Sequence, residues 1–460
     1  MTTQPLRVAV VGGGIAGLAA AHALLHPTDG GPAAEVTVFD REPAMGGKLR
    51  AAPFAGHPAI DEGPDAFLAR LPWATALARA VGLGEQLVAP QSGKAAVWWN
   101  QLHPIPDGLL LGMPTEVFAL AKSRLLSWPG KVRAATEPLR RSTSLEPDSL
   151  GAYVRARFGD EVHVRLVDPL VGSIYAADTD HFSLAAVPQI ADLAGKGRSV
   201  LLTGRRMPTP PATSGPVFYA PRDGMGAFAA TTATKVAAAG GTLRTGHTVQ
   251  AIEPDGNGWR IDDDPFDAVV LASPAAATAR LLRDLAPAQA TMLTAIPAAD
   301  VAMVTLAISA ADWPERLRGM SGYLVPKPMQ RLVTATSFGS QKWAHWAVDG
   351  SVILRISLGR DGSPVLHLAD DQLLQAAIDE VSQHLGIALQ PTHSRVSRWA
   401  GAFPQYRPHH AQRVAQIEAG LPSGLVLAGA SYHGIGVPAC IRSAQNAVAA
   451  LHALSRSMAE

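Results

Sequence analysis

Three glycines and an aspartate near the N-terminus have the residue types and spacing needed to bind a dinucleotide. Gly12, Gly14 and Gly17 follow the spacing G-x-G-x-x-G, and Asp40 comes after them. The first glycine permits a tight turn, the second lets backbone approach a pyrophosphate, and the third lets a helix pack closely on a strand. An acid at Asp40 can accept hydrogen bonds from a ribose hydroxyl. These residues predict recognition of a dinucleotide.

The residues around these four must position them as strand, helix and strand. Residues 7–11 (RVAVV) are apolar and β-branched and predict a buried strand. Residues 18–25 (LAAAHALL) predict a helix, and the apolar run 36–39 predicts a second strand that ends at Asp40. The N-terminal end of such a helix offers unpaired N–H groups to phosphates. A glycine motif alone is weak, but these flanking elements favour a dinucleotide site over an ordinary turn.

A second glycine step indicates which dinucleotide is bound. Met45-Gly46-Gly47-Lys48 follows the second strand closely. A Gly-Gly-basic step at this place resembles the second phosphate contact of two-domain FAD oxidoreductases, which NAD-binding units usually lack. The alternative is an ordinary loop.

Length and composition bound the class of protein. A chain of 460 residues with 47% hydrophobic and 17% charged residues predicts two or three globular domains. The formal net charge of +1 gives no reason to expect nucleic acid as a partner. A single cysteine, no signal-peptide pattern and no apolar run near about 20 residues predict a cytoplasmic protein.

The rest of the chain predicts an α/β fold, with a Rossmann-like dinucleotide-binding domain, a mixed α+β substrate domain and a helical insertion. We expect a helical pattern over 67–88, a proline-punctuated loop over 102–108, and strands at 97–99, 248–253, 259–261, 266–274, 301–309, 331–337 and 352–358. The expected domains are an FAD-binding domain (1–69, 216–280 and 402–460), a substrate-binding domain (70–107, 205–215 and 281–401) and a helical domain (108–204).

The helical insertion leaves two interpretations open. Its segments 117–126 and 130–139 combine basic and apolar residues, as helices that rest on a membrane surface do. Ordinary solvated helices that pack on one another fit the same pattern and are favoured.

The sequence resembles the flavin-dependent protoporphyrinogen and coproporphyrinogen oxidases over its full length. The resemblance implies a Rossmann-like FAD-binding domain of the amine-oxidase/protoporphyrinogen-oxidase type. The most specific matches are DEGPDAFL at 61–68, LHPIP at 102–106, GSIYA at 172–176 with FSL at 182–184, and AGASYHGIGVPACI at 428–441. The sequence is most similar to the soluble Gram-positive branch, whose members oxidise coproporphyrinogen III to coproporphyrin III.

The resemblance implies a set of residues that bind FAD without a covalent bond. They are Gly12, Gly13, Gly14, Ile15, Ala16 and Gly17 at the pyrophosphate, Asp40 at the adenosine ribose (where the family more often has Glu), Arg41, Gly47 and Lys48 along the adenine–phosphate arm, Gly63, Pro64, Asp65 and Ala66 beside the isoalloxazine ring, Val249 at the adenine, Trp399 beside the cofactor, and Ile435, Gly436 and Val437 at the flavin N1/O2 edge. Negative charge builds at that edge on reduction, where N–H donors stabilise it.

The chemistry implied by the resemblance is dehydrogenation of a macrocycle, with hydride transfer to flavin N5 and reoxidation by O2 that yields H2O2. Such a step needs orientation more than a catalytic base, and the sequence contains no convincing triad, metal cluster or acid–base pair. Lys94 and Arg70 are the candidates to bind substrate propionates, and exposed solubilising charges are the alternative. We expect His409-His410 to be solvated loop residues, and Cys440 to be a buried helix residue that does not tether FAD.

Other functions remain open from the sequence. Protoporphyrinogen IX oxidase is the nearest, followed by an amine oxidase or desaturase of the same fold, and then a non-enzymatic carrier of lipid-modified proteins. The resemblance also suggests O2 as co-substrate, a transient contact with the ferrochelatase of the pathway, and a monomer or homodimer.

Overall fold

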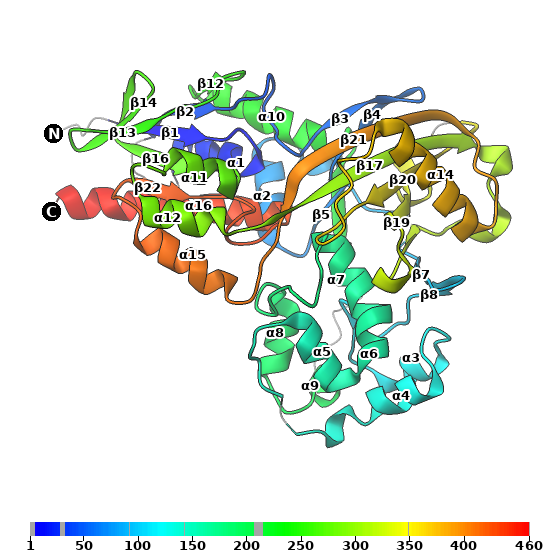
Figure 1. Ribbon diagram of the computed structural model, residues 1–460. Coiled ribbons are helices and arrows are strands. Elements are labelled where there is room, and N and C mark those ends of the chain that lie inside the picture. The colour runs from blue at the N-terminus through cyan, green and yellow to red at the C-terminus, as the bar shows by residue number, and fades with distance from the viewer. Residues whose placement is uncertain are drawn as a thin grey trace.

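The computed structural model describes residues 5–27, 33–91, 93–141, 143–206, 215–347 and 349–459. Two sheets lie side by side, and a helical segment packs below them, so that the molecule has three lobes in projection (Figure 1). The two termini lie at the same end of the first sheet.

The first sheet is built from three separated parts of the chain. Its five parallel strands run in the order β12 (Thr242–Arg244), β2 (Glu35–Phe39), β1 (Arg7–Val11), β16 (Ala268–Leu271) and β22 (Leu425–Leu427). The strands predicted at 7–11 and 36–39 are therefore confirmed. The apolar residues of β1 alternate between two buried faces, as expected of a parallel sheet covered on both sides.

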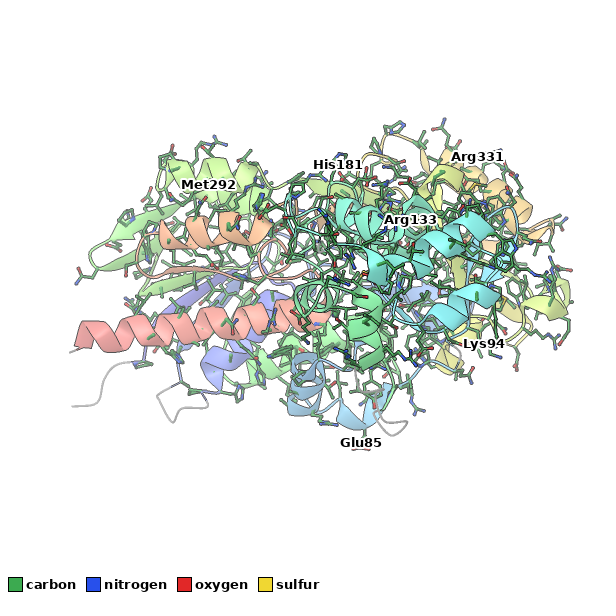
Figure 2. All side chains as sticks on the ribbon, turned by 90° about the horizontal axis from the view of Figure 1, so that it is seen from below. Glu85, Lys94, Arg133, His181, Met292 and Arg331 are labelled. Atoms are coloured by element: carbon green, nitrogen blue, oxygen red, sulfur yellow. The ribbon has the colours of Figure 1, made fainter. Side chains whose placement is uncertain are left out.

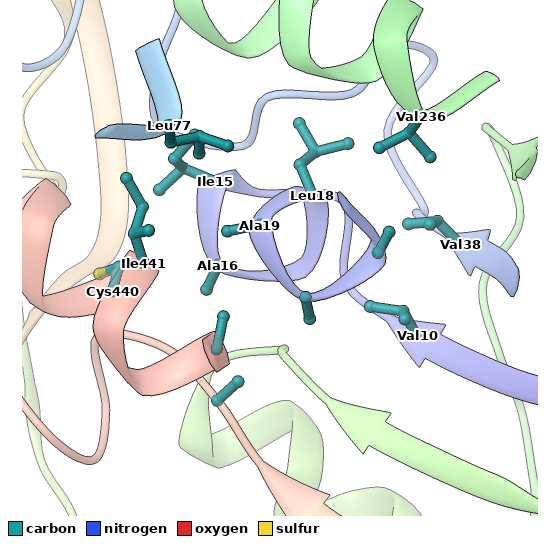
Figure 3. Packing of buried hydrophobic residues seen from close by; sticks show 14 of the residues in the cluster. Val10, Ile15, Ala16, Leu18, Ala19, Val38, Leu77, Val236, Cys440 and Ile441 are labelled. Atoms are coloured by element: carbon teal, nitrogen blue, oxygen red, sulfur yellow. The ribbon is translucent and has the colours of Figure 1, made fainter. Parts of the chain in front are cut away.

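Helices cover both faces of this sheet. Helices α1 (Ile15–Leu25), α10 (Gly224–Ala238) and α16 (Val437–Ala459) pack on one face, with α2 (Pro72–Ala80) beside them. The close-up in Figure 3 shows Ile15 and Ala16 of α1 facing Cys440 and Ile441 of α16. Helices α11 (Ala275–Leu281), α12 (Pro287–Thr294) and α15 (His410–Ala419) cover the other face, near the hairpin strands β13 (Ile252–Asp255), β14 (Gly258–Ile261) and β15 (Asp264–Phe266).

The second sheet has seven strands and carries one side of the site. Its order is β21 (Pro391–Pro404), β17 (Ala298–Ser309), β20 (Ser351–Leu358), β19 (Val333–Phe338), β18 (Gly322–Leu324), β7 (Ala95–Trp98) and β8 (Leu102–Pro104). Helix α14 (Asp370–Leu385) covers one face. The hairpin of β3 (Ala51–Phe54) and β4 (His57–Asp61) packs against residues of β17 and β20 on the other. The long pair β17–β21 runs back towards the first sheet.

The helical segment has its own core. It contains α3 (Val117–Lys122), α4 (Trp128–Ala135), η2 (Glu137–Leu139), α5 (Leu150–Phe158), α6 (Asp160–Val162), a π-helical turn (His163–Val167), α7 (Asp168–Tyr175), α8 (Pro188–Gly195) and α9 (Val200–Arg206). A buried ion pair fastens it to the second sheet: Arg360, just after β20, donates to both carboxylate oxygens of Asp168, at 2.9 and 3.2 Å. The predicted helical character of this segment is confirmed.

Several short strands were missed, and for β5 and β6 the reason is that their partner is distant in sequence. Residues 67–88 are not one helix: β5 (Phe67–Leu68) and β6 (Leu87–Val88) both pair with β11 (Phe218–Pro221). The predicted loop at 102–108 contains β8, and β9 (Leu109–Leu110) with β10 (Met113–Pro114) precedes the first helix of the helical segment. The strand expected at 248–253 begins only at Ile252. The three-domain division stays a prediction, and most of its segment 205–215 lies outside the described residues.

Candidate cofactor and substrate site

The glycine turn after β1 has a conformation that only glycine supports. Gly12 has φ +116°, and a Cβ there would lie 2.8 Å from the Ala272 backbone. A Cβ on Gly17 would lie 1.8 Å from the Gly12 carbonyl oxygen. At Gly14, by contrast, an added Cβ would meet no atom within 4 Å. The turn is therefore tight where it meets the protein and open at Gly14, as a surface that receives a ligand requires.

The start of α1 fits an anion. No side chain caps this helix, although Ile15 and Ala16 in its first turn are buried. The first N–H groups of a helix have no partner within the helix, and burial without a partner is costly. An uncapped, buried helix start beside the open space at Gly14 is what a pyrophosphate would complete.

Asp40 links the glycine turn to the segment after β2 through two hydrogen bonds. Its Oδ2 accepts a hydrogen bond from the Gly13 N–H at 2.6 Å, and its Oδ1 accepts one from the Glu42 N–H at 2.8 Å. Each carboxylate oxygen retains a lone pair, so the predicted ribose contact remains compatible with this arrangement. Arg41, next in sequence, is exposed and pairs with Glu42 at 3.3 Å.

The Gly46-Gly47-Lys48 step returns to the same turn. The Gly46 N–H donates to the Gly13 carbonyl at 2.8 Å, and a Cβ on Gly47 would lie 3.1 Å from the Cα of Gly14. The Lys48 ammonium donates to the Ala402 carbonyl of β21, and burial lowers its pKa. The two glycine motifs and a lysine that reaches the second sheet thus meet at one place.

The loop 60–66, which includes the end of β4, contains the residues 63–66 that were predicted to lie beside the flavin ring. Side chains of the second sheet hold this loop. Arg355 of β20 donates to the Gly63 carbonyl, Trp399 of β21 donates to the Glu62 carbonyl at 3.0 Å, and Arg395 of β21 donates to the Ile60 carbonyl at 2.9 Å. These bonds satisfy three partly buried carbonyls in and beside an irregular segment. They fix the loop relative to both sheets.

Asp65 anchors the end of this loop in a buried charge cluster. Its carboxylate lies 3.0 Å from the Lys342 ammonium and 3.5 Å from the Arg355 guanidinium, and accepts from the Trp343 indole N–H at 3.1 Å. Burial alone would raise the pKa of Asp65, but Lys342 and Arg355 outweigh it and hold that pKa well below its usual range. Asp65 is therefore an ionised anchor. The exposed Pro64 lies beside it, and Ala66 packs on the core that lies under β3 and β4.

Asp61 lies at the other end of the loop and caps α10. Its Oδ1 accepts from the Met225 N–H at 2.7 Å, while its Oδ2 is buried with no partner among the described residues. Burial raises the pKa of Asp61 to about 7, against the opposing effect of Arg355. Asp65 is thus held ionised, whereas the pKa of Asp61 lies close to neutral pH.

The start of α16 lies next to the start of α1. A Cβ on Gly429 would be 3.5 Å from the Ala16 Cβ, and Ile441 and Ala16 belong to one core. Val437 is buried, Gly436 is exposed with nothing nearer to an added Cβ than 3.8 Å, and Ile435 packs on the core of the helical segment. These residues therefore lie close to the glycine turn, whereas Val249 is buried with Phe39 in the core on the opposite face of the first sheet.

The surroundings of Cys440 and of the His409-His410 pair test two further predictions from the sequence. Cys440 is buried, and burial raises the pKa of its thiol to about 11, so it is a poor nucleophile. The prediction that His409 and His410 are both solvated is wrong for His410, which is buried with its ring stacked 3.8 Å from that of Tyr406. The Nε2 atom of His409 lies 3.6 Å from a carboxylate oxygen of Glu146, so the two histidines have different neighbours.

A cavity of about 60 Å³ lies between the helical segment and the second sheet. It is lined by side chains that include Ser173 and Ala176 at the end of α7, Met303 of β17, Ser357 of β20 and Phe403 of β21. The predicted propionate ligands Arg70 and Lys94 are exposed and are not part of its lining. Figure 2 shows Lys94 towards one edge of the molecule.

Sequence reasoning missed Arg355, Arg395, Lys342 and Trp343. One signal was available, because Arg355 is the single charge within the apolar run 352–358. A charge in a buried strand is placed there only with a partner. The partner, a loop almost 300 residues earlier, was not deducible from the sequence.

The comparisons with known proteins agree on one family. The sequence model described as flavin containing amine oxidoreductase matches residues 15–452. Proteins named coproporphyrinogen III oxidase are 35% identical in Mycobacterium tuberculosis, covering 96% of this chain and 97% of the relative, and 31% identical in Bacillus subtilis, covering 97% and 98%.

Solved structures share the fold. A crystal structure from Exiguobacterium sp., whose description proposes a protoporphyrinogen oxidase, has a TM-score of 0.85 and 28% identity, covering 98% of this chain and all of that one. Cyclohexylamine oxidase from Brevibacterium oxydans has a TM-score of 0.71 at 16% identity, covering 99% and 100%.

The Asp65 cluster makes a prediction about stability. Replacing Asp65 with Asn keeps the size of the side chain but leaves Lys342 and Arg355 without their counter-charge. Breaking a buried pair costs about 3–5 kcal/mol, and we expect the lower value because the Lys342 side chain is 21% exposed. Urea unfolding at pH 7 measures the loss.

The pH dependence tests the cause. The folded-state pKa of Asp65 lies below the ordinary 3.8, so its contribution is present above about pH 4 and is lost as the pH falls further. The difference between wild type and Asp65→Asn should therefore shrink below pH 4. The exposed Asp192→Asn of α8 is the control. Equal losses in both variants at pH 7 would contradict the buried-pair account.

Proposed function

The chain belongs to the flavin containing amine oxidoreductases, and we propose that it oxidises coproporphyrinogen III to coproporphyrin III with non-covalently bound FAD and O2. The observation that carries the proposal is the near full-length similarity to relatives with that name, together with the two glycine motifs that meet at the start of α1. The second candidate is oxidation of protoporphyrinogen IX, favoured by the description of the Exiguobacterium structure.

The residues present fit FAD. Gly12 to Gly17 and the uncapped start of α1 would hold its pyrophosphate, Asp40 its ribose, and Gly47 with Lys48 and Arg41 the adenine–phosphate arm. Gly63 to Ala66, Trp399 and the backbone of 435–437 would border the ring, and Val249 the adenine. When bound, FAD supplies a hydride acceptor that O2 restores. Non-covalent binding is supported by the buried, weakly acidic Cys440.

The protein's part in the reaction is to position the substrate. The charged groups nearest the loop 60–66 already have protein partners: Arg355 and Lys342 hold Asp65, and Arg395 holds backbone. They orient the loop and are not free to exchange protons with a substrate. Orientation of a macrocycle between this loop and the cavity wall at Ser173 and Met303 is the contribution that we assign to the chain.

The substrate has four propionates, which need positive partners. Arg70 follows β5 and Lys94 precedes β7, and both are exposed. Neither residue lines the cavity, and exposed cations suit carboxylates at the periphery of a macrocycle. We therefore retain both as propionate ligands.

We also propose that the outer end of the helical segment touches a membrane surface. Trp128 is 75% exposed, Val132 59% and Leu139 83%. The exposed basic residues around them are Lys122, Arg124, Arg140 and Arg141, and the acid Glu137 nearby is buried in a pair with Arg157. Apolar residues flanked by cations suit an anionic bilayer surface. None of the described helices is long and apolar enough to cross a bilayer.

The cytoplasmic location, the oligomeric state and the contact with ferrochelatase stay predictions.

The cofactor proposal predicts that acid precipitation releases yellow FAD into the supernatant. Replacing Gly14 with Val would fill the open space where backbone meets the pyrophosphate, so we expect that variant to purify without flavin. Gly195→Val, at the end of α8, is the control, because an added Cβ there also meets no atom within 4 Å and Gly195, like Gly14, does not have a positive φ. Flavin that stays with the precipitate, or normal flavin in Gly14→Val, would refute the assignment.

The substrate proposal predicts a preference between two porphyrinogens measured side by side by porphyrin fluorescence. Coproporphyrinogen III should give the higher kcat/KM. Lys94→Met and Arg70→Met should raise KM for this substrate more than for protoporphyrinogen IX, by less than about fivefold each, because exposed ion pairs contribute about 0–1 kcal/mol.

The exposed Arg331→Met, on the loop before β19, is the matched control for loss of one positive charge. Equal effects on both substrates would remove Lys94 and Arg70 from propionate recognition. A wild-type preference for protoporphyrinogen IX would establish the second candidate instead.

The membrane proposal predicts that the protein cosediments with vesicles that contain phosphatidylglycerol, and less with pure phosphatidylcholine or at high salt. Each apolar side chain that enters the interface contributes about 1.5–3 kcal/mol, so Trp128→Ser with Leu139→Ser should weaken binding at least about tenfold. Leu454→Ser on α16 is the control for an exposed apolar residue elsewhere. Unchanged sedimentation of the double variant would reject this surface.

A further inference from the structure

One buried hydroxyl group bridges two backbone groups of the loop 428–436, which lies between β22 and α16. The Tyr406 hydroxyl donates to the Ala430 carbonyl at 2.6 Å and accepts from the Gly434 N–H at 2.8 Å. Tyr406 itself lies just beyond β21, outside the loop, and is buried. One oxygen therefore fixes the separation of two backbone groups four residues apart.

The loop needs such a restraint because its backbone is irregular. Gly434 has φ +121°, and a Cβ there would lie 2.6 Å from the Ala439 Cβ. The three residues that follow, 435–437, are the ones proposed to present N–H groups to the flavin edge. The hydrogen bond from the Gly434 N–H to the Tyr406 hydroxyl fixes the orientation of this peptide group. It therefore also fixes the direction in which the chain enters α16.

The tyrosine is in turn held on three sides. Its ring stacks on His410 at 3.8 Å and lies parallel to Phe182 at 6.2 Å, and its carbonyl accepts from the Ser183 N–H at 2.7 Å. Burial raises the pKa of Tyr406 above its ordinary range, so the hydroxyl keeps the proton that it donates to Ala430. Burial also lowers the pKa of His410 to about 4, so a neutral ring stacks on Tyr406 at neutral pH.

We propose that Tyr406 is a positioning residue that aims the backbone N–H groups of 435–437 at the reduced cofactor and connects them to the helical segment through Phe182 and Ser183. The proposal rests on the proposed flavin site at the start of α16. Hydrogen bonds to an edge where negative charge develops favour the reduced form, and a displaced donor favours it less.

The test compares Tyr406→Phe with Tyr323→Phe in the purified holoenzyme. Both variants remove one buried hydroxyl and keep the ring; the Tyr323 hydroxyl lies 3.1 Å from His384 Nδ1, in the second sheet away from the loop. We expect Tyr406→Phe to move the flavin midpoint potential to more negative values and to speed amide exchange in the peptide that spans 430–440. Loss of one hydrogen bond predicts about two- to tenfold weaker FAD binding. Tyr323→Phe should change none of the three.

Each result has one meaning. An unchanged potential and unchanged exchange in Tyr406→Phe, with a fall in thermal stability equal to that of Tyr323→Phe, would overturn the proposal and leave a structural hydroxyl. A wild-type protein that purifies without flavin and does not bind added FAD would overturn it together with the cofactor assignment. A wild type that binds FAD but oxidises neither porphyrinogen would reject the proposed substrate alone, because none of the three readouts uses substrate.

Discussion

A buried backbone group must have a hydrogen-bond partner, and the site is organised by this constraint. Binding a flat, charged cofactor against backbone requires irregular loops, which cannot satisfy their own carbonyls and N–H groups as helices and sheets do. In this protein the partners come from elsewhere in the chain. Arg355, Arg395 and Trp399 take the carbonyls of the loop 60–63, and Asp40 takes the Gly13 N–H. The proposed cofactor site therefore depends on the contact between the two sheets.

This dependence explains the charges of the site. Burying the cations of Lys342 and Arg355 costs desolvation free energy. The carboxylate of Asp65 lies between them, offsets this cost and holds the loop in place. Asp61, at the other end, has no cation within ion-pairing distance among the described residues, and burial moves its pKa to about 7. Because the hydride-accepting chemistry belongs to the cofactor, these groups are free to serve as anchors.

The part of the fold that could be predicted is the part specified by local pattern. The strand 7–11, the glycine turn, α1 and β2 follow from residues that lie within a few positions of one another. Two-residue strands such as β5 and β6 could not be found, because β11, which pairs with both, lies about 130–150 residues away. His410 was misjudged for the same reason: a histidine in a polar stretch predicts exposure, and only the tertiary stack on Tyr406 buries it.

The helical segment contacts both parts of the proposed site. Its ion pair with Arg360 lies beside the cavity, since Arg360 is also one of the residues that line it, and its Phe182 and Ser183 reach the tyrosine that spans the loop before α16. The segment therefore touches both the wall proposed for the substrate and the loop proposed for the cofactor, although its own outer surface is far from either (Figure 1). A displacement of α7 would change the cavity wall at Ser173 and the restraint on Tyr406 together. Contact of the outer surface with a membrane would thus act on a segment that the Arg360–Asp168 pair and the Phe182–Tyr406 contact join to both parts of the proposed site.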